Sequence, residues 1–182
     1  MRPAMRPEDG ATLSWLRERV AEMMHHLREH HGDDPRAQAM FKKVADVQLL
    51  PEAEINQASG SWRNGKFKHS TGVLYVAGRD NNDELRTHSS LLKTVVHELA
   101  HATRFKEPGE SSHSQQWKQT WLWLLEVATQ ALGWDVEVRC SQCTYYGLCE
   151  PHQCPKCKWM ANLCKPYTGA PLEQHAPLAK YA

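Results

Sequence analysis

Apolar residues recur every three or four positions in three stretches of the chain, the spacing that predicts amphipathic helices. The stretches are Leu13–Glu29, Thr87–Lys106 and a third that begins at His113. The apolar positions of the second stretch are Leu91, Leu92, Val95, Val96, Leu99 and Ala100. Those of the third are Trp117, Trp121, Leu124, Leu125, Ala128 and Leu132. The pattern therefore predicts one N-terminal helix and a pair of helices in the second half of the chain.

Two shorter stretches, Gln48–Ile55 and Gly72–Ala77, are typical of β-strands. Gly60, Asn64 and Gly65 lie between them and favour a turn. The second strand is followed by the helix predicted at Thr87–Lys106, and we expect it to present an open edge that an extended peptide can pair with. Helices and strands together predict an α+β fold, with a small sheet packed on helices.

The central helix contains a histidine–glutamate–x–x–histidine motif. His97 and His101 are four residues apart, so they project from the same face of the helix and can hold one divalent metal ion. Glu98 lies beside them, where it can reach a metal-bound water and act as a general base. The motif predicts a zinc site with hydrolytic chemistry.

A catalytic zinc site takes three protein ligands and leaves one position for water. Two residues are candidates for the third ligand. His113 follows the Pro108-Gly109 turn, which lets the chain fold back toward the first helix, and Trp117 one helical turn later can anchor it. Glu126 lies further along the same helical stretch, where thermolysin-type enzymes place a glutamate ligand. We favour His113.

All six cysteines fall between residues 140 and 164. Cys140-x-x-Cys143 and Cys154-x-x-Cys157 are separated by ten residues, a spacing suited to one tetrahedral structural zinc ion. Disulfide bonds are the alternative, but they need an oxidising compartment, and no secretory signal is expected at this N-terminus. Cys149, His152 and Cys164 lie outside the two pairs, and each could be a substitute ligand. Cys149 and Cys164 could instead be free thiols.

The order of these motifs resembles the SprT-like family of zinc metalloproteases, which includes the eukaryotic protease Spartan. His97, Glu98 and His101 match its first motif. His113 and Trp117 match its second, with Ser114 in place of glycine and tryptophan in place of phenylalanine or tyrosine. The resemblance covers about residues 44–159. It implies a zincin-like domain at residues 1–138, a zinc ribbon at 139–165 and a flexible tail at 166–182, with one catalytic and one structural zinc ion.

Charge and hydropathy restrict the partners. The net charge of +1 argues against a nucleic-acid binder that works through overall charge. Residues 139–182 carry five Lys or Arg against two acids, so the ribbon could contact a nucleic-acid strand, although such lysines can also be purely solubilising. No apolar stretch is long enough to span a membrane. We expect a soluble, monomeric protein in the cytoplasm or associated with the nucleoid or nucleus.

By this resemblance the chain is a zinc-dependent metallopeptidase that cleaves proteins on or near DNA, as in the repair of DNA–protein crosslinks. Its partners are then a protein substrate and DNA. The alternative is a nucleic-acid-binding or antirestriction-type protein that keeps a zincin scaffold without peptidase activity.

Overall fold

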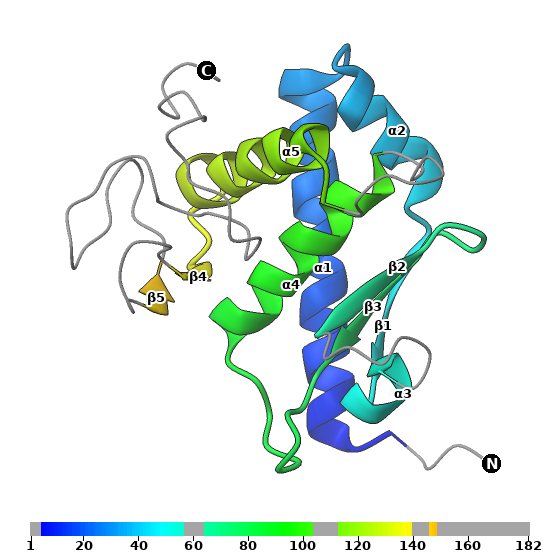
Figure 1. Ribbon diagram of the computed structural model, residues 1–182, viewed down its shortest axis with the longest axis vertical. Helices are drawn as coiled ribbons and strands as arrows, with labels where there is room; N and C mark the ends of the chain where they lie inside the picture. The colour runs from blue at the N-terminus through cyan, green and yellow to red at the C-terminus, as the bar shows by residue number, and fades with distance from the viewer. Residues whose placement is uncertain (1–4, 57–63, 104–112, 140–145, 149–182) are drawn as a thin grey trace.

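The computed structural model describes residues 5–56, 64–103, 113–139 and 146–148 (Figure 1). In chain order, the elements are α1 (Pro7–His31), α2 (Pro35–Lys43), β1 (Asp46–Leu50), α3 (Glu52–Asn56), β2 (Gly65–Lys68), β3 (Val73–Ala77), α4 (His88–Ala102), α5 (Gln115–Glu126), the π-helical turn η1 (Val127–Ala131), β4 (Glu137–Arg139) and β5 (Tyr146–Leu148).

In the described part of the chain, β1, β3 and β2 form a three-stranded sheet with β3 in the centre. β1 is parallel to β3, and β2 is antiparallel to it. The turn between β2 and β3 ends at Gly72, whose φ is +69°. A Cβ at that position would lie 2.1 Å from the carbonyl oxygen of Lys43, so only glycine fits both the backbone and the space.

The prediction of an open edge on the strand at Gly72–Ala77 is wrong, because β3 has a neighbour on each side. The edge strand next to α4 is β2, which lies partly in the segment that was expected to be a turn. β2 has four residues, and its Gly-Lys-Phe-Lys sequence carries one large apolar side chain. Such a short segment gives only a weak strand signal.

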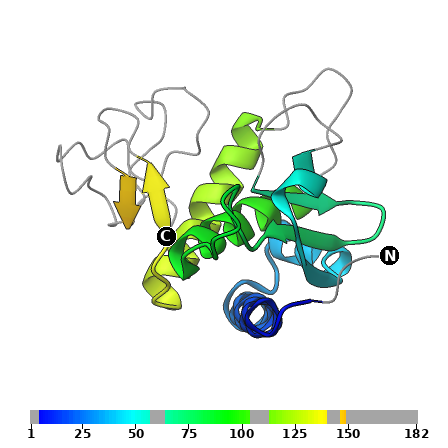
Figure 2. The same ribbon diagram turned by 90° about the horizontal axis from the view of Figure 1, so that it is seen from below.

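Helix α4 lies at the centre of the molecule. Figures 1 and 2 show the three-stranded sheet on one side of α4 and the β4–β5 pair on the other, with α1 running alongside. Thr87 caps the helix by accepting a hydrogen bond from the backbone N–H of Ser90 at 3.3 Å. Its buried apolar face joins one hydrophobic cluster with α1, the sheet and α5. The members contributed by α4 are Leu91, Leu92, Val95, Val96, Leu99, Ala100 and Ala102.

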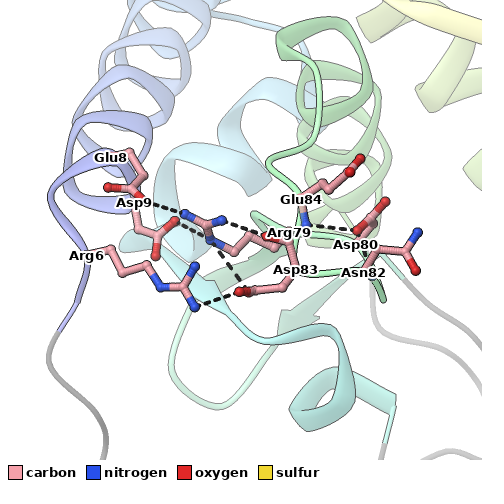
Figure 3. A network of polar contacts seen from close by, with 8 residues as sticks. All are labelled: Arg6, Glu8, Asp9, Arg79, Asp80, Asn82, Asp83 and Glu84. Atoms are coloured by element: carbon pink, nitrogen blue, oxygen red, sulfur yellow. Dashed lines mark hydrogen bonds and ion pairs between the residues drawn. The ribbon is translucent and has the colours of Figure 1, made fainter.

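An ionic network attaches the start of α1 to the segment between β3 and α4 (Figure 3). Arg79 donates from Nε to Asp9 Oδ1 and from Nη2 to Glu8 Oε1, both at 2.9 Å. Nearby, Arg6 donates from Nη2 to Asp83 Oδ2 at 2.6 Å. Arg79 and Asp9 are partly buried, with side chains 17% and 20% exposed, so salt screens their contact less than it screens the more exposed pair of Arg6 and Asp83. The network joins residues about 70 positions apart and holds the approach to α4 in place.

The predicted α+β class is confirmed, and the helices expected at Leu13–Glu29 and Thr87–Lys106 correspond to α1 and α4. The strand expected at Gln48–Ile55 stops at Leu50 and gives way to α3. The last predicted helix starts at Gln115, because Ser114 is its N-cap. None of the helices in the described ranges is both long and apolar enough to span a membrane.

Candidate metal centre

Three histidines converge beside α4. His97 and His101 lie one turn apart on this helix, and their Nε2 atoms are 3.3 Å from each other. His113 precedes α5, and its Nε2 lies 3.1 Å from that of His97. Among the described residues, these three histidines form the one group of at least three possible metal ligands. Their ligand atoms all lie within 4.8 Å of one another.

The spacing of these atoms fits a tetrahedral metal ion. Zinc binds imidazole nitrogen at about 2.0–2.1 Å, so two ligands of a tetrahedral ion lie about 3.3–3.4 Å apart. The two Nε2–Nε2 distances, 3.3 and 3.1 Å, are close to that value. The donor set is also suitable, because neutral imidazole is the commonest protein ligand for zinc. The site could therefore bind zinc with little rearrangement.

His113 reaches the site because α5 begins immediately after it. The side chain of Ser114 accepts a hydrogen bond from the backbone N–H of Trp117 at 3.4 Å and caps the helix. The structure thus brings together the three histidines predicted as ligands. Glu126, the other candidate, is the last residue of α5 and is not part of this group.

Trp117 lies against all three imidazoles. Its ring centroid is 4.8 Å from that of His97, 5.1 Å from that of His101 and 4.3 Å from that of His113. Its side chain is 1% exposed and belongs to the hydrophobic core. The aromatic anchor predicted for His113 therefore supports the other two histidines as well.

Glu98 is buried between the histidines and the sheet. Its Oε1 lies 4.0 Å from His97 Nε2, and the residue is 5% exposed. On its other side it faces β2, where a Cβ added to Gly65 would lie 3.1 Å from the same oxygen and 2.5 Å from Cγ2 of Thr94. Gly65 and Thr94 thus determine how closely β2 approaches the helix that carries the histidines.

Neither of these two residues is predicted as part of the site from the sequence. The one signal for β2 was the alternation of small or apolar residues with lysine in Gly65–Lys68, which is the period of a strand. Thr94 gave no signal, because a threonine within an apolar helix face is common.

The four cysteines predicted to bind zinc, Cys140, Cys143, Cys154 and Cys157, lie outside the described residues, as do Cys149, His152 and Cys164. The structure does describe two short antiparallel strands, β4 and β5, on either side of the first Cys-x-x-Cys pair in the chain. Arg139 of β4 is paired with Tyr146 of β5.

Comparison with known proteins decides the family. Residues 5–172 match the model of the Phycodnaviridae minor capsid protein P4 family. The chain is 40% identical over 152 residues to minor capsid protein P4 of Paramecium bursaria Chlorella virus 1. The aligned region covers 84% of this chain and 83% of that protein. This chain belongs to the minor capsid protein P4 family. No solved structure matches it.

Membership of the P4 family overturns the functional predictions. The chain is a relative of capsid proteins, so the SprT-like assignment and the predicted metallopeptidase activity are wrong. The roles that depended on them fall too: Glu98 as general base, a protein substrate, DNA as a partner and crosslink repair. The antirestriction alternative gains no support either. The error has a physical source, since a motif of one helical turn and a following histidine specifies metal-binding geometry but no reaction.

Proposed function

We propose that this chain is a structural component of a virus particle, a minor capsid protein that works through contacts with other capsid proteins. The observation that carries this proposal is the 40% identity to a minor capsid protein over most of both chains. A single continuous hydrophobic core built from α1, the sheet, α4 and α5 is consistent with a rigid building block.

In this role the three histidines form a structural metal centre. A zinc ion held by His97, His101 and His113 would tie α4 to the start of α5, across the eleven residues that separate the second and third ligands. Such an ion stabilises the folded chain, because the unfolded chain does not present the three ligands together. Two of the ligands lie on one helix beside a small sheet, as in zincins. In this proposal the bound ion stabilises the fold and catalyses no reaction.

A second zinc ion bound by Cys140, Cys143, Cys154 and Cys157 completes the proposal. Support comes from the two Cys-x-x-Cys pairs and from the β4–β5 strands that flank the first pair. Residues 139–165 would then be a small zinc ribbon appended to the domain at residues 1–138, followed by a tail at 166–182. So small a module depends on its metal for most of its folding energy.

The capsid role is tested on particles of the virus that encodes this chain. Purified particles are treated with nuclease and washed in high salt, and the chain is then quantified against the major coat protein by mass spectrometry. We expect a constant ratio between the two proteins across preparations and washes. Loss of the chain on washing, or its absence from the particles, would show that it is not a capsid component.

A further inference from the structure

The central strand β3 separates two ends of the molecule that carry opposite charge. The chain enters β3 from the β2–β3 turn and leaves it into the segment 78–87. A strand of five residues puts these two segments about 17 Å apart. Figure 1 shows the β2–β3 turn beside the end of α2, and the segment 78–87 beside the start of α1.

The end that follows β3 is acidic. Among the described residues, five carboxylates and two guanidinium groups gather there (Figure 3): Glu8, Asp9, Asp80, Asp83 and Glu84, with Arg6 and Arg79. Both arginines already donate to carboxylates of this group. The group therefore keeps an excess of three negative charges.

The segment that carries most of these acids is a preformed protrusion. The backbone N–H of Arg86 donates to the Gly78 carbonyl at 3.0 Å, and that of Asp80 donates to the Glu84 carbonyl at 2.9 Å. Residues 81–85, at the turn between these bonds, are all exposed. Because the segment is already ordered, little conformational entropy is lost when it docks on another protein.

The acidic end also exposes apolar side chains. Leu85 of the protrusion is 44% exposed, and Met5 is 53% exposed. They are the two large apolar residues that are exposed in the part of the chain that the structure describes. Met5 precedes Arg6, which binds Asp83 two positions before Leu85. Apolar side chains surrounded by charges are the usual composition of a protein–protein interface.

The end that precedes β3 is basic. Four lysines and a histidine lie there: Lys42, Lys43, Lys66, Lys68 and His69. Lys66 and Lys68 are exposed and alternate along β2, so both project from the same face of the sheet. The backbone N–H of Ala45 donates to the Gly72 carbonyl at 2.8 Å, which holds the chain after α2 against the β2–β3 turn.

The charge of this basic end is not cancelled by the acid beside it. Asp46 of β1 pairs in register with Val73, but its carboxylate accepts two hydrogen bonds at 2.9 Å from the Arg17 guanidinium. Partial burial and the nearby charge of Lys43 lower the pKa of His69 below its ordinary value. Lys43 therefore lies close to the β2–β3 turn, and its charge acts there.

We propose that copies of this chain associate head to tail, with the acidic protrusion of one copy docked on the basic end of the next. The inference rests on the proposed function, because it names a second copy as one of the capsid neighbours. Two like ends repel each other, whereas the net charge of +1 adds little repulsion between whole copies. A contact between unlike ends repeats from copy to copy, so it builds a ring or a row.

Sedimentation velocity of the purified full chain tests the association. At low salt we expect the sedimentation coefficient to rise with protein concentration. In about 0.5 M sodium chloride it should return to that of a monomer, because salt screens exposed charges. A chain that stays monomeric at low salt would overturn the proposal, and so would an association that salt leaves unchanged.

Paired variants at exposed positions identify the two surfaces. Glu84→Lys with Leu85→Ser alters the acidic end, and Lys66→Glu with Lys68→Glu alters the basic end. Each variant alone should associate at least about tenfold more weakly than wild type, because one half of every contact is altered. A mixture of the two retains one intact protrusion and one intact basic end, so it should form dimers that grow no further.

Glu18→Lys is the matched control, because it reverses an exposed acid of α1 outside both ends and should behave as wild type. Urea denaturation verifies that every variant is folded. A folded variant that associates alone like wild type, or a mixture that stays monomeric, would overturn the proposal. A monomeric chain that remains in washed particles contradicts only the head-to-tail contact. A chain that associates but is absent from the particles contradicts the capsid role instead.

Discussion

At Gly65 the sheet lies close to the helix that carries the metal ligands. A side chain there would meet Cγ2 of Thr94 at 2.5 Å and Cγ of Glu98 at 3.0 Å, both on buried parts of α4. Because protein interiors are close-packed, α4 and β2 would have to separate to make room. The position of Glu98 beside His97 thus depends on the absence of a side chain in the neighbouring strand.

We predict that Gly65→Ala lowers the free energy of unfolding by about 1–3 kcal/mol, the usual cost of overpacking. Urea denaturation measures the change. Thr94→Ser removes the methyl group that the new Cβ would meet and keeps the hydroxyl, which donates to the Ser90 carbonyl at 3.2 Å. The double variant should therefore recover part of the loss. A Gly65→Ala protein as stable as wild type would mean that β2 does not pack against α4 this closely.

The ligand histidines could be proposed from sequence because their positions follow from helical geometry. His97 and His101 are one helical turn apart, and the Pro108-Gly109 turn together with the Trp117 anchor favoured His113 as the third ligand. The function of the site could not be predicted in this way. Three histidine ligands specify where an ion can bind, but the residue types alone do not show whether that ion stabilises the fold or activates water.

At the scale of elements, length decided what the sequence could predict. α1 and α4 have 25 and 15 residues and carry repeated apolar positions, so their periodicity is clear. β2 has four residues and α3 has five, so their periods give only a weak signal. α2 has nine, and its start depends on a local signal: Asp34 accepts from the backbone N–H of Arg36 at 2.8 Å, and Pro35 follows it.

The cap of α2 gives a pH-dependent prediction. The Arg36 guanidinium, which donates to the Asp34 carboxylate, holds the pKa of Asp34 below its ordinary value of 3.8. The ionised form is therefore favoured in the folded chain, and this stabilisation is complete above the unfolded-state pKa and is lost as the pH falls through the folded one. We predict that Asp34→Ala costs about 1 kcal/mol at neutral pH.

Denaturation of three proteins at a series of pH values checks this prediction. Asp34→Asn keeps a capping oxygen but cannot titrate, so it should lose less stability than Asp34→Ala at neutral pH. The gap between wild type and Asp34→Asn should narrow as the pH falls below about 4 and through the lowered pKa of Asp34. A gap that stays constant over this range would show that the ionised Asp34 does not contribute to the stability of α2.

At the scale of the whole molecule, the two lines of inference gave different answers. The arrangement of α1, the sheet, α4 and α5 around one core places three histidines together, as the motif order predicts. The match over residues 5–172 instead compares nearly the entire chain, and it gives a capsid family. A match of that length outweighs a resemblance carried by a few motif residues, because the same few residues can recur on unrelated proteins.

The central claim is that this P4-family chain holds a metal ion through His97, His101 and His113. The most direct measurement is the number of zinc ions per folded chain, determined by mass spectrometry under native conditions. We predict two ions in wild type, Glu126→Ala and His25→Ala, and one ion in His113→Ala, with the cysteine site still filled. A His113→Ala chain that keeps both ions, or a Glu126→Ala chain that loses one, would contradict the three-histidine centre.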